Sequence, residues 1–517
     1  MGATTPPAPK PRRERTTRPR RGAASTAPRQ PSETERLGVV HLTAEYWPFA
    51  RTGGLGEAVA GLATFQAAAG HRTTVIMPLY QLVRETTPSL ERTGHTLTLT
   101  LGGHTERAWL YQVPTPGPGP RVFFIEHPDF FDRAGIYGDN GADYPDNAQR
   151  FAFFCLAALT ALPELAPDVQ LLHAHDWHTA LAPVYLRTTF ADQPFYSRLA
   201  VVTSVHNAGF QGHFSPETVA GLGFAPELYN PRVFEWYGRM NMLKGALACS
   251  DVAVTVSPTH ARELCTPEGG FGLHDTFTAM GDRLVGILNG IDPVLWNPAT
   301  DLELPEHFSS DDLAGKRRCK AALQHAYGLA EEPNTPLFGM SARMVTQKGL
   351  DLVLGADLLS STNAQFVFLG AGEHRYHEAL GELAASAPDR MAVEFMFTDH
   401  VEHRLLAGAD ALLMPSLYEP CGLTQMRAQR YGAVPVARRV GGLSDSIIDG
   451  VTGFLFDEYT PAALQQAVRR AVDEYADRTG WKKMVRAAMA QQFGWDRSAT
   501  QYLALYRQAL AVRSTAG

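Results

Sequence analysis

The segment Pro336-Leu-Phe-Gly-Met-Ser-Ala-Arg-Met-Val-Thr-Gln-Lys-Gly349 places an apolar run before a turn that carries two cations and ends on a glycine. This order predicts a buried strand, a loop and then a helix, which is the repeating unit of a parallel sheet. The segment Glu419-Pro-Cys-Gly-Leu-Thr-Gln425 follows a similar apolar run at 411–415 and supplies a carboxylate and a glycine turn. The two segments therefore predict two polar loops at the carboxyl edge of one sheet.

These two loops have the chemistry that a diphosphate requires. Arg343 and Lys348 are the cations, and the glycine turn after Glu419 can direct backbone amides toward an anion. The chain contains no Asp-x-Asp pair, the usual means of holding a divalent cation on a nucleotide-sugar. We therefore expect a site for a nucleoside diphosphate with a sugar attached, where Arg and Lys replace a metal ion. From these residues alone, ordinary surface positions for the two cations are an equally good explanation.

The length and composition limit the class of protein. A chain of 517 residues is too long for one compact core, so two domains with a cleft between them are expected. We find no apolar run long enough to span a membrane and no signal peptide. Five widely spaced cysteines favour reduced thiols over disulfides or a zinc site. These features predict a cytoplasmic protein that does not contact a membrane.

Residues 1–36 form a basic tail with nine Lys and Arg, three Glu and seven Pro. Such a segment cannot bury enough apolar surface to order itself, so we predict that it is disordered. The whole chain has a net charge of −7, so the remainder is more acidic still, which argues against an enzyme acting on nucleic acid. The tail could contact nucleic acid, a membrane or an acidic partner, or act as a plastid-type transit peptide, but a solvated extension is the simpler interpretation.

From Leu37 onward, apolar runs alternate with helical segments, which is typical of parallel sheets covered on both faces. Strands are predicted at 37–43, 72–77, 169–172, 199–203 and 252–256, and then at 336–340, 365–369, 393–397, 411–415 and 434–436. The fold class is therefore predicted as α/β, with doubly wound domains at 37–288 and 336–490 and a connection at 289–335. Their strand carboxyl ends would face one cleft. A long helical region follows at about 460–511, and we expect the helix at 491–517 to pack back toward the N-terminal domain.

Two motifs of the first domain allow competing interpretations. Arg51-Thr-Gly-Gly-Leu-Gly-Glu57 lies between a predicted strand and a predicted helix, where glycines and free amides suit a phosphate. Its spacing is not that of the dinucleotide fingerprint, so a structural turn explains it equally well. Tyr144-Pro-Asp-Asn147 precedes an apolar helix, and simple N-capping would explain it.

The segment His173-Ala-His-Asp-Trp-His178 follows the predicted strand at 169–172. Three histidines within six residues suggest a metal site, but no further cluster of Asp and His completes one. We favour a loop in which one imidazole faces a sugar hydroxyl, joined by an amide from Val205-His-Asn207 at the end of the next strand.

Ten ordered motifs make the chain resemble the bacterial glycogen synthase and starch synthase family from about Leu37 to the C-terminal helix. They are TGGLG at 52–56, YPDN at 144–147, HAHDWHTAL at 173–181, SVHNAGFQG at 204–212, VSPTHARE at 256–263, LNGIDPVLWNPATD at 288–301, RMVTQKGLDLVL at 343–354, LGAGE at 369–373, EPCGLTQ at 419–425 and GGLSD at 441–445. The resemblance implies a retaining glucosyltransferase of GT-B type, with two facing Rossmann-like domains and a deep interdomain cleft. It also implies glucose transfer from a nucleoside diphosphate, usually ADP in bacteria, to the non-reducing end of an α-1,4-glucan, without a cofactor or metal.

The resemblance further implies roles for individual residues. Arg343 and Lys348 would hold the diphosphate and stabilise it as it leaves, Glu419 would be the essential carboxylate, and His175 would line the glucosyl site as part of the catalytic group. Phe397 would stack on the nucleotide base. The full set of implied substrate-binding residues is Arg51, Gly53, Gly54, Asp146, Asn207, Asn289, Phe397, Cys421, Gly422, Leu423 and Thr424.

Two positions depart from the family pattern. The family lysine before Thr-Gly-Gly is Arg51 in this chain, and the Asp of Gly-Leu-Ala-Asp is Glu57. A planar guanidinium and a compact ammonium are not interchangeable at a phosphate, so donor affinity or loop closure is expected to change.

Several alternatives to an ADP-glucose-dependent synthase remain open from the sequence. They are the use of UDP-glucose or another acceptor, a phosphorylase, a zinc hydrolase and a non-catalytic glucan-binding protein. The presence of Arg343, Lys348 and Glu419 together favours catalysis. Because no nucleophile for a double displacement is evident, we expect front-face attack by the acceptor beside the departing phosphate.

Overall fold

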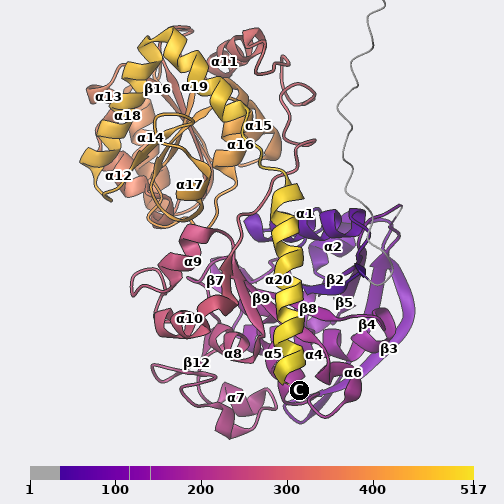
Figure 1. The fold of residues 1–517 in the computed structure, drawn as a ribbon. Coiled ribbons are helices and arrows are strands. Elements are labelled where there is room, and N and C mark those ends of the chain that lie inside the picture. Colours follow the sequence, from indigo (N-terminus) through magenta and orange to yellow (C-terminus); the bar gives the residue numbers. More distant parts are fainter. Residues whose placement is uncertain (1–34, 116, 140, 517) are drawn as a thin grey trace, which may run out of the picture.

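The computed structural model describes residues 35–115, 117–139 and 141–516, so nearly all of the tail predicted at 1–36 lies outside the described residues. The chain forms two α/β domains, with the N-terminal domain below and the C-terminal domain above in Figure 1. This arrangement agrees with the predicted fold class. Among the described residues, no helix is long and apolar enough to cross a bilayer.

The N-terminal domain is built on a sheet with the strand order β14-β13-β9-β8-β1-β2-β5-β4-β3. The strands from β14 to β5 run parallel, and the hairpin of β3 and β4 adds an antiparallel edge. Their bounds are β1 Gly38–Leu42, β2 Arg72–Pro78, β3 Glu91–Leu101, β4 His104–Val113, β5 Arg121–Glu126, β8 Leu171–His175, β9 Ala200–Val205, β13 Val252–Thr255 and β14 Leu284–Gly286.

The other elements of this domain are helices that cover the sheet and short strands in loops. The helices are α1 Gly54–Ala68, α2 Gln81–Thr86, α3 Pro128–Phe131, α4 Asn147–Leu165, α5 Leu181–Arg187, α6 Pro194–Ser197, α7 Thr218–Gly221, α8 Met242–Cys249, α9 Pro258–Leu264 and α10 His274–Met280. The short strands are β6 Gly138–Asp139, β7 Ala142–Asp143, β10 His213–Phe214, β11 Glu235–Trp236 and β12 Arg239–Asn241.

The C-terminal domain has a parallel sheet in the order β17-β16-β15-β18-β19-β20. Its strands are β15 Leu337–Ser341, β16 Gln365–Leu369, β17 Met391–Glu394, β18 Ala411–Met414, β19 Val434–Arg438 and β20 Phe454–Phe456. Its helices are α12 Leu350–Gly355, α13 Leu358–Ser361, α14 His374–Ser386, α15 Asp399–Gly408, α16 Thr424–Arg430, α17 Gly441–Ser446, α18 Pro461–Ala476 and α19 Arg478–Met489, preceded by α11 Ala314–Ala326 and followed by α20 Trp495–Ala516.

The central strands explain the apolar runs of the sequence. Every residue of β1, β8, β9, β15 and β16 is buried, as expected for parallel strands with helices on both faces. The predicted strand positions agree with the structure within a few residues, and the Pro- and Gly-rich stretch after Val113 connects β4 to β5 as a turn.

Three local predictions need correction. The histidines at 173 and 175 belong to strand β8 itself and not to a loop after it, because the strand runs on to His175. Strand β17 ends at Glu394, so Phe397 lies in the following loop. The helical region at about 460–511 is divided into α18, α19 and α20.

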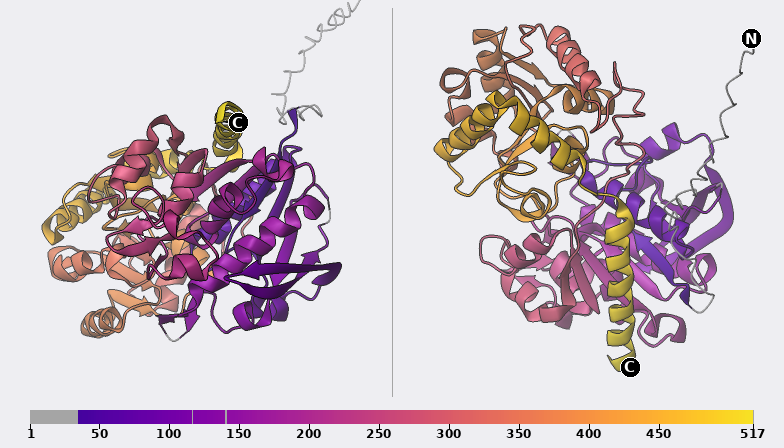
Figure 2. Two further views of the ribbon diagram at one scale, coloured as in Figure 1. Left: turned by 90° about the horizontal axis from the view of Figure 1, so that it is seen from below. Right: turned by 45° about the horizontal axis from the view of Figure 1, so that its top comes forward.

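Helix α20 returns from the C-terminal domain to the N-terminal domain, where it lies along the sheet as the long yellow helix of Figures 1 and 2. At the start of α20, the Trp495 side chain fills space that is open because residue 61 is a glycine. A Cβ added at Gly61 would lie 2.0 Å from Trp495 Nε1. Further along, the Arg513 side chain donates to the Ser197 carbonyl at 2.8 Å. The last helix is therefore an integral part of the N-terminal domain.

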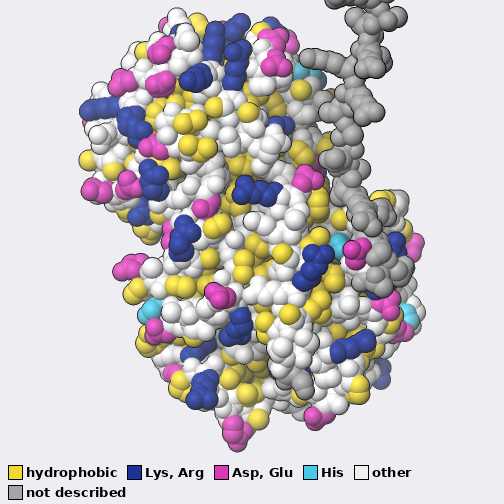
Figure 3. Space-filling model, viewed as in Figure 1, with side chains coloured by type: hydrophobic (Ala, Val, Ile, Leu, Met, Phe, Trp, Pro, Cys, Tyr) yellow, Lys and Arg dark blue, Asp and Glu magenta, His cyan; other side chains and the backbone are white. Residues whose placement is uncertain are grey.

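The two domains meet through loops and helices that follow the carboxyl ends of their strands. Arg51, after β1, contacts Asp399, after β17, and Thr259, after β13, contacts Asp445, after β19. Figure 3 shows the molecular surface notched between the domains on one side. The strand ends of both sheets thus face the interdomain boundary, which is where doubly wound folds bind their ligands.

Candidate active site

The two segments singled out in the sequence lie against each other at the carboxyl edge of the C-terminal sheet. Lys348 donates from Nζ to Glu419 Oε2 at 2.6 Å, and Ser416 Oγ donates to the same oxygen at 2.9 Å. Glu419 is buried, whereas the Lys348 ammonium is partly exposed. The carboxylate therefore holds the cation in one position while leaving it accessible to an anion from the boundary.

The backbone around Lys348 depends on Gly349. This residue has φ +76°, and a Cβ added to it would lie 2.0 Å from the Pro415 carbonyl oxygen. A glycine is required because the turn leading into α12 has a left-handed conformation and presses against the loop after β18. The Leu417 amide also donates to the Gln347 carbonyl at 2.8 Å. These contacts fix the relative position of the two loops.

Hydrogen bonds from neighbouring residues hold the loop after Glu419 in place. Gly422 has φ +67°, and the Gln425 side chain donates to the Cys421 and Gly422 carbonyls at 3.0 and 2.8 Å. The Gly442 amide donates to the Glu419 carbonyl at 3.1 Å, so the start of α17 supports the same turn. Gly422, Leu423 and Thr424 remain partly exposed toward the boundary.

Two residues that were predicted to contact the substrate are exposed at this edge of the C-terminal sheet. Arg343 is exposed and has no ion pair with any described residue. Phe397 exposes 44% of its surface in the loop between β17 and α15. An unpaired guanidinium and an uncovered ring are available for a phosphate and a planar base, respectively.

Across the boundary, the glycine loop of the N-terminal domain is held by a carboxylate that the sequence analysis missed. Glu45, which is buried, accepts hydrogen bonds from the Thr52 amide at 2.7 Å, the Thr52 hydroxyl at 2.8 Å and the Tyr137 hydroxyl at 2.6 Å. Gly53 and Gly54 are exposed, and the Cβ position of Gly54 lies 3.7 Å from Leu423 Cδ1. The glycine loop therefore faces the loop after Glu419 directly.

Both positions that depart from the family pattern belong to one ion-pair network between the domains. Arg51 donates to Glu57 at 2.6 Å and to Asp399 at 2.5 Å. Glu57 also pairs with Arg427, whose second nitrogen donates to Glu402 at 3.1 Å. Arg51 thus contacts the other domain directly through Asp399, and Glu57 of its own domain links it to Arg427, an arrangement that the sequence did not reveal.

Asn207 and Asn289 also lie against the C-terminal domain. Burial raises the pKa of the Tyr418 hydroxyl, and a hydrogen bond with the Asn207 side chain opposes this shift. Asn289 is buried, and its Oδ1 has no hydrogen-bond partner among the described residues. It lies beside Cys421, and burial raises the pKa of the Cys421 thiol to about 12. Cys421 is therefore uncharged at neutral pH and unsuited to act as a nucleophile.

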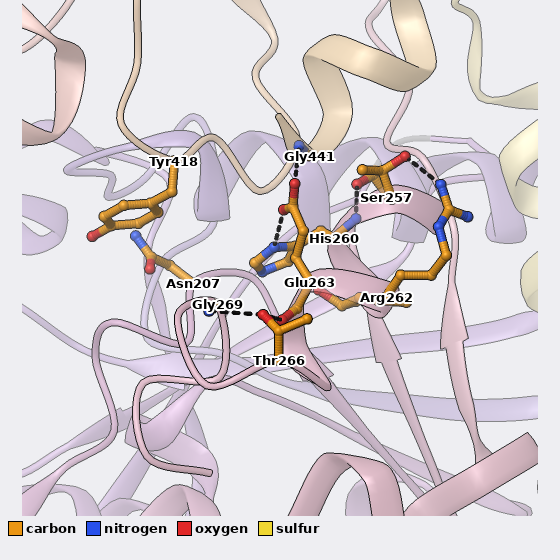
Figure 4. Close-up of polar contacts among 12 residues, drawn as sticks. Asn207, Ser257, His260, Arg262, Glu263, Thr266, Gly269, Tyr418 and Gly441 are labelled. Atoms are coloured by element: carbon orange, nitrogen blue, oxygen red, sulfur yellow. Dashed lines mark hydrogen bonds and ion pairs between the residues drawn. The ribbon is translucent and has the colours of Figure 1, made fainter. Parts of the chain in front are cut away.

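A second set of contacts joins helix α9 to the start of α17 (Figure 4). Figure 4 shows the Glu263 carboxylate accepting from the Gly441 amide, at 2.9 Å. The Asp445 carboxylate accepts from the Thr259 amide and hydroxyl at 2.8 and 2.7 Å. The same view places Asn207 under Tyr418. Contacts at α9 and at Arg51 together hold the domains face to face on both sides of the Lys348–Glu419 pair.

His175 does not reach the boundary. It is 1% exposed, and both of its ring nitrogens are occupied: Nε2 lies 3.0 Å from His41 Nδ1, and Nδ1 lies 3.0 Å from His206 Nε2. His206 follows the end of β9 and is only partly buried. The imidazole that comes to the boundary is therefore that of His206, and His175 lies behind it.

His41, His173 and His175 have ligand atoms within 4.8 Å of one another, a spacing that could hold a metal ion. Their nitrogens already hydrogen-bond to one another or to Gln66, Tyr506 and Ser204. Burial lowers the pKa of His41 to about 4 and those of the other two well below the ordinary value, so all three are neutral at pH 7. An ion would have to replace satisfied hydrogen bonds, and we interpret the group as a hydrogen-bonded cluster.

Asp146 lies apart from these groups. It precedes α4, but its side chain does not cap the helix; it accepts two hydrogen bonds from Arg133, at 2.8 and 2.6 Å. None of its contacts within the described residues reaches the C-terminal domain.

Other residues at the boundary were not found from the sequence. Glu45 could have been noticed, because it comes three residues after a buried strand and precedes the glycine loop. Asp399 and Arg427 gave no signal, since their partners Arg51 and Glu57 lie 348 and 370 positions away, and Glu402 is recognisable only through its contact with Arg427.

Comparisons with known proteins agree with this geometry. Residues 38–279 match the model of the starch synthase catalytic domain, and residues 327–488 match that of the glycosyl transferases group 1. The chain is 41% identical to a glycogen synthase of Syntrophotalea carbinolica (92% of this chain, 99% of the relative) and 39% identical to glycogen synthase 2 of Geobacter sulfurreducens (92% and 100%). The solved catalytic domain of starch synthase IV from Arabidopsis thaliana, bound to ADP and acarbose, superimposes with a TM-score of 0.84 at 33% identity, covering 92% of this chain and all of that one. The chain is therefore a glycosyltransferase and belongs to the glycogen synthase and starch synthase family.

Proposed function

We propose that this enzyme transfers glucose, with retention, from ADP-glucose to the non-reducing end of an α-1,4-glucan. The observation that carries the proposal is the Lys348–Glu419 pair at 2.6 Å, at strand ends that face the other domain, together with the exposed Arg343, which forms no ion pair within the described part of the chain. The relatives named glycogen synthase and the starch synthase bound to ADP and acarbose support this donor and acceptor. We expect the enzyme to act in the cytoplasm without a metal or cofactor.

The proposed reaction is front-face attack. The bond between the glucosyl C1 and the diphosphate oxygen breaks, the acceptor O4 forms a bond to C1 on the same face, and the departing oxygen takes the acceptor proton. Arg343 and Lys348 stabilise the negative charge that grows on the diphosphate, and Glu419 keeps the Lys348 ammonium in place. The high pKa of Cys421 is consistent with the absence of a covalent intermediate at that position.

The glucosyl group is proposed to lie between the loop from Cys421 to Thr424 and the ends of β9 and β14. His206 and Asn207 would contact it from the N-terminal domain, with His175 positioned behind His206. The unpartnered Asn289 Oδ1 can accept a hydrogen bond from a sugar hydroxyl there.

The remaining predicted residues fit outer parts of the same site. We propose that Phe397 stacks on the adenine ring, that Gly53 and Gly54 let the backbone approach the donor, and that Asp146 belongs to the acceptor side. On this proposal, residues 37–288 form the acceptor and catalytic domain, 289–335 the connection, and 336–490 the nucleotide-sugar domain, with 491–517 completing the first domain.

The test is transfer of labelled glucose from ADP-glucose and from UDP-glucose onto glycogen, each with and without EDTA. We expect transfer from ADP-glucose that EDTA does not reduce. Lys348→Ala should lower kcat by roughly a hundredfold or more, the effect of losing a preorganised charge partner. Lys482→Ala, at an exposed position of α19, is the matched control and should retain activity. Normal turnover by Lys348→Ala would refute the proposed role, and transfer from UDP-glucose alone would refute the proposed donor.

A further inference from the structure

A continuous hydrogen-bonded chain runs through the interior of the N-terminal domain, from His206 at the boundary to helix α20. His206 Nε2 lies 3.0 Å from His175 Nδ1, His175 Nε2 lies 3.0 Å from His41 Nδ1, and His41 Nε2 lies 2.8 Å from Gln66 Oε1. Gln66 Nε2 then donates to the Tyr506 hydroxyl at 2.8 Å. We call these five residues the relay.

The relay has a branch at its far end, and all of its members except His206 are closed to solvent. The Tyr506 hydroxyl lies 2.9 Å from His173 Nδ1, and His173 Nε2 lies 2.7 Å from Ser204 Oγ. His41, Gln66, His175 and Tyr506 are each at most 1% exposed. Each of these four members therefore depends on its neighbours for hydrogen bonds, because no water competes for them.

The amide group of Gln66 gives the relay a direction. Gln66 Oε1 can only accept, so His41 must carry its proton on Nε2, and its Nδ1 must accept. His175 then donates from Nε2 and accepts at Nδ1, and His206 in turn donates from Nε2. If the Gln66 amide were rotated so that Nε2 faced His41, the donor and the acceptor would be exchanged in each of these bonds. One glutamine thus determines the tautomer of three histidines.

This direction determines what His206 presents at the boundary. With the proton on Nε2, the free lone pair is on Nδ1, which has no hydrogen-bond partner among the described residues. The imidazole is neutral, because burial lowers the pKa of His206 to about 4. In this tautomer His206 offers a hydrogen-bond acceptor to the cleft; in the opposite tautomer it would offer a donor.

We propose that Gln66 and Tyr506 are positioning residues that hold His206 as the Nε2–H tautomer, with Nδ1 ready to accept a hydrogen bond from a hydroxyl of the transferred glucose. The substrate part of this inference rests on the proposed function, whereas the tautomer part does not. Because Tyr506 belongs to α20, the last helix contributes directly to the orientation of a group at the reaction site.

The tautomer is measured on the substrate-free protein by ¹⁵N NMR with selectively ¹⁵N-labelled histidine. The His206 signals are identified by their loss in His206→Gln. We expect a single neutral Nε2–H form in the unaltered protein between pH 6 and 8. Gln66→Met and Tyr506→Phe remove the amide and the hydroxyl that holds it, so both tautomers of His206 should become populated.

The kinetic readout uses the same variants. Each should lower kcat by roughly tenfold, the lower end of the effect known for losing a group that orients a metal-ligating histidine, with little change in KM for the glucan. The matched control is Tyr185→Phe, which removes another buried tyrosine hydroxyl, bonded to the Leu222 carbonyl at 2.8 Å, from the same domain. Circular dichroism and thermal unfolding show whether each variant folds. If Gln66→Met or Tyr506→Phe fails to fold, the proposal is tested with the other variant.

An Nδ1–H form of His206 in the unaltered protein would overturn the proposal, and so would unchanged kcat in both folded relay variants. If the protein transferred no glucose at all, the proposed function would fail, but the tautomer would still be decided by the spectrum.

Discussion

The Arg51 guanidinium lies 2.5 Å from the Asp399 carboxylate, which joins the glycine loop of one domain to the first turn of α15 in the other. A second nitrogen of the same guanidinium donates to Glu57 at 2.6 Å. Arg51 therefore bridges the domains through one nitrogen, while the other nitrogen anchors the guanidinium on Glu57 of its own domain. The position where the family has a lysine thus contributes to closure of the domains in this protein.

Replacing Arg51 by Lys should weaken this bridge, because one ammonium cannot reproduce the two-nitrogen geometry. Both carboxylates are partly exposed, so the loss should be about 0.5 kcal/mol, or a twofold to threefold rise in the donor KM. Steady-state kinetics at low and high salt measure this rise in the donor KM. Arg318→Lys, which alters the exposed pair of Arg318 with Glu306 inside one domain, should leave KM unchanged. Equal kinetics for Arg51→Lys and the unaltered enzyme would contradict the bridge.

Asp445→Ala should favour separation of the domains. The Asp445 carboxylate accepts two hydrogen bonds from Thr259 across the boundary, and both are lost when it is removed. Small-angle X-ray scattering should detect a larger radius of gyration, and the donor KM should rise several-fold, as expected for two charge-assisted hydrogen bonds at an exposed site. Asp473→Ala on the surface of α18 is the matched control. An unchanged scattering curve would show that this contact does not hold the domains together.

Gly349→Ala should disturb both stability and turnover. A Cβ at this position would lie 2.0 Å from the Pro415 carbonyl oxygen, and the backbone is left-handed. The free energy of unfolding should fall by about 1–3 kcal/mol, and kcat should fall because Lys348 is the preceding residue. Urea unfolding and kinetics measure the two effects. Gly381→Ala, in α14 with open space around its Cβ position, should be neutral or slightly stabilising. A stable, fully active Gly349→Ala protein would be evidence against the tight packing of the two loops.

The buried His178 should make the protein less stable in acid. Burial lowers its pKa to about 3, so the unfolded chain binds a proton near pH 6.5 that the folded chain does not bind until about pH 3. Its contribution to stability is complete above pH 6.5 and is lost as the pH falls toward 3, by about 1.4 kcal/mol per pH unit. His178→Phe should reduce the slope of unfolding free energy between pH 6 and 4.5 by that amount. His104→Gln, at an exposed position, is the control. The same slope in all three proteins would disprove the contribution.

The arrangement of strands and helices could be predicted from the sequence, because buried parallel strands need continuous apolar runs and the loops after them need polar residues and glycine. Lys348 and Glu419 were recognisable for this reason: each follows such a run by a few residues, and the structure brings them to 2.6 Å. The pairing of these two loops could thus be expected from local sequence.

The placement of His175 was not recognisable in the same way. The apolar run ends at Leu172 in the sequence, yet β8 continues to His175, whose two ring nitrogens hydrogen-bond to His41 and His206. A histidine that ends a strand in the sequence can be covered by the next strand, and only the packing of β8 beside β9 shows that His206 is the outer residue.

The sequence by itself determined the two α/β domains, the family and the loops that carry Lys348, Glu419 and the glycines, because these depend on residue patterns within short segments. Only the tertiary structure decided how Arg51 bridges to Asp399, which imidazole faces the cleft, and that Tyr506 of the last helix connects to Gln66 of the first. These contacts join residues hundreds of positions apart, and their geometry follows from the packing of whole domains and not from any local pattern.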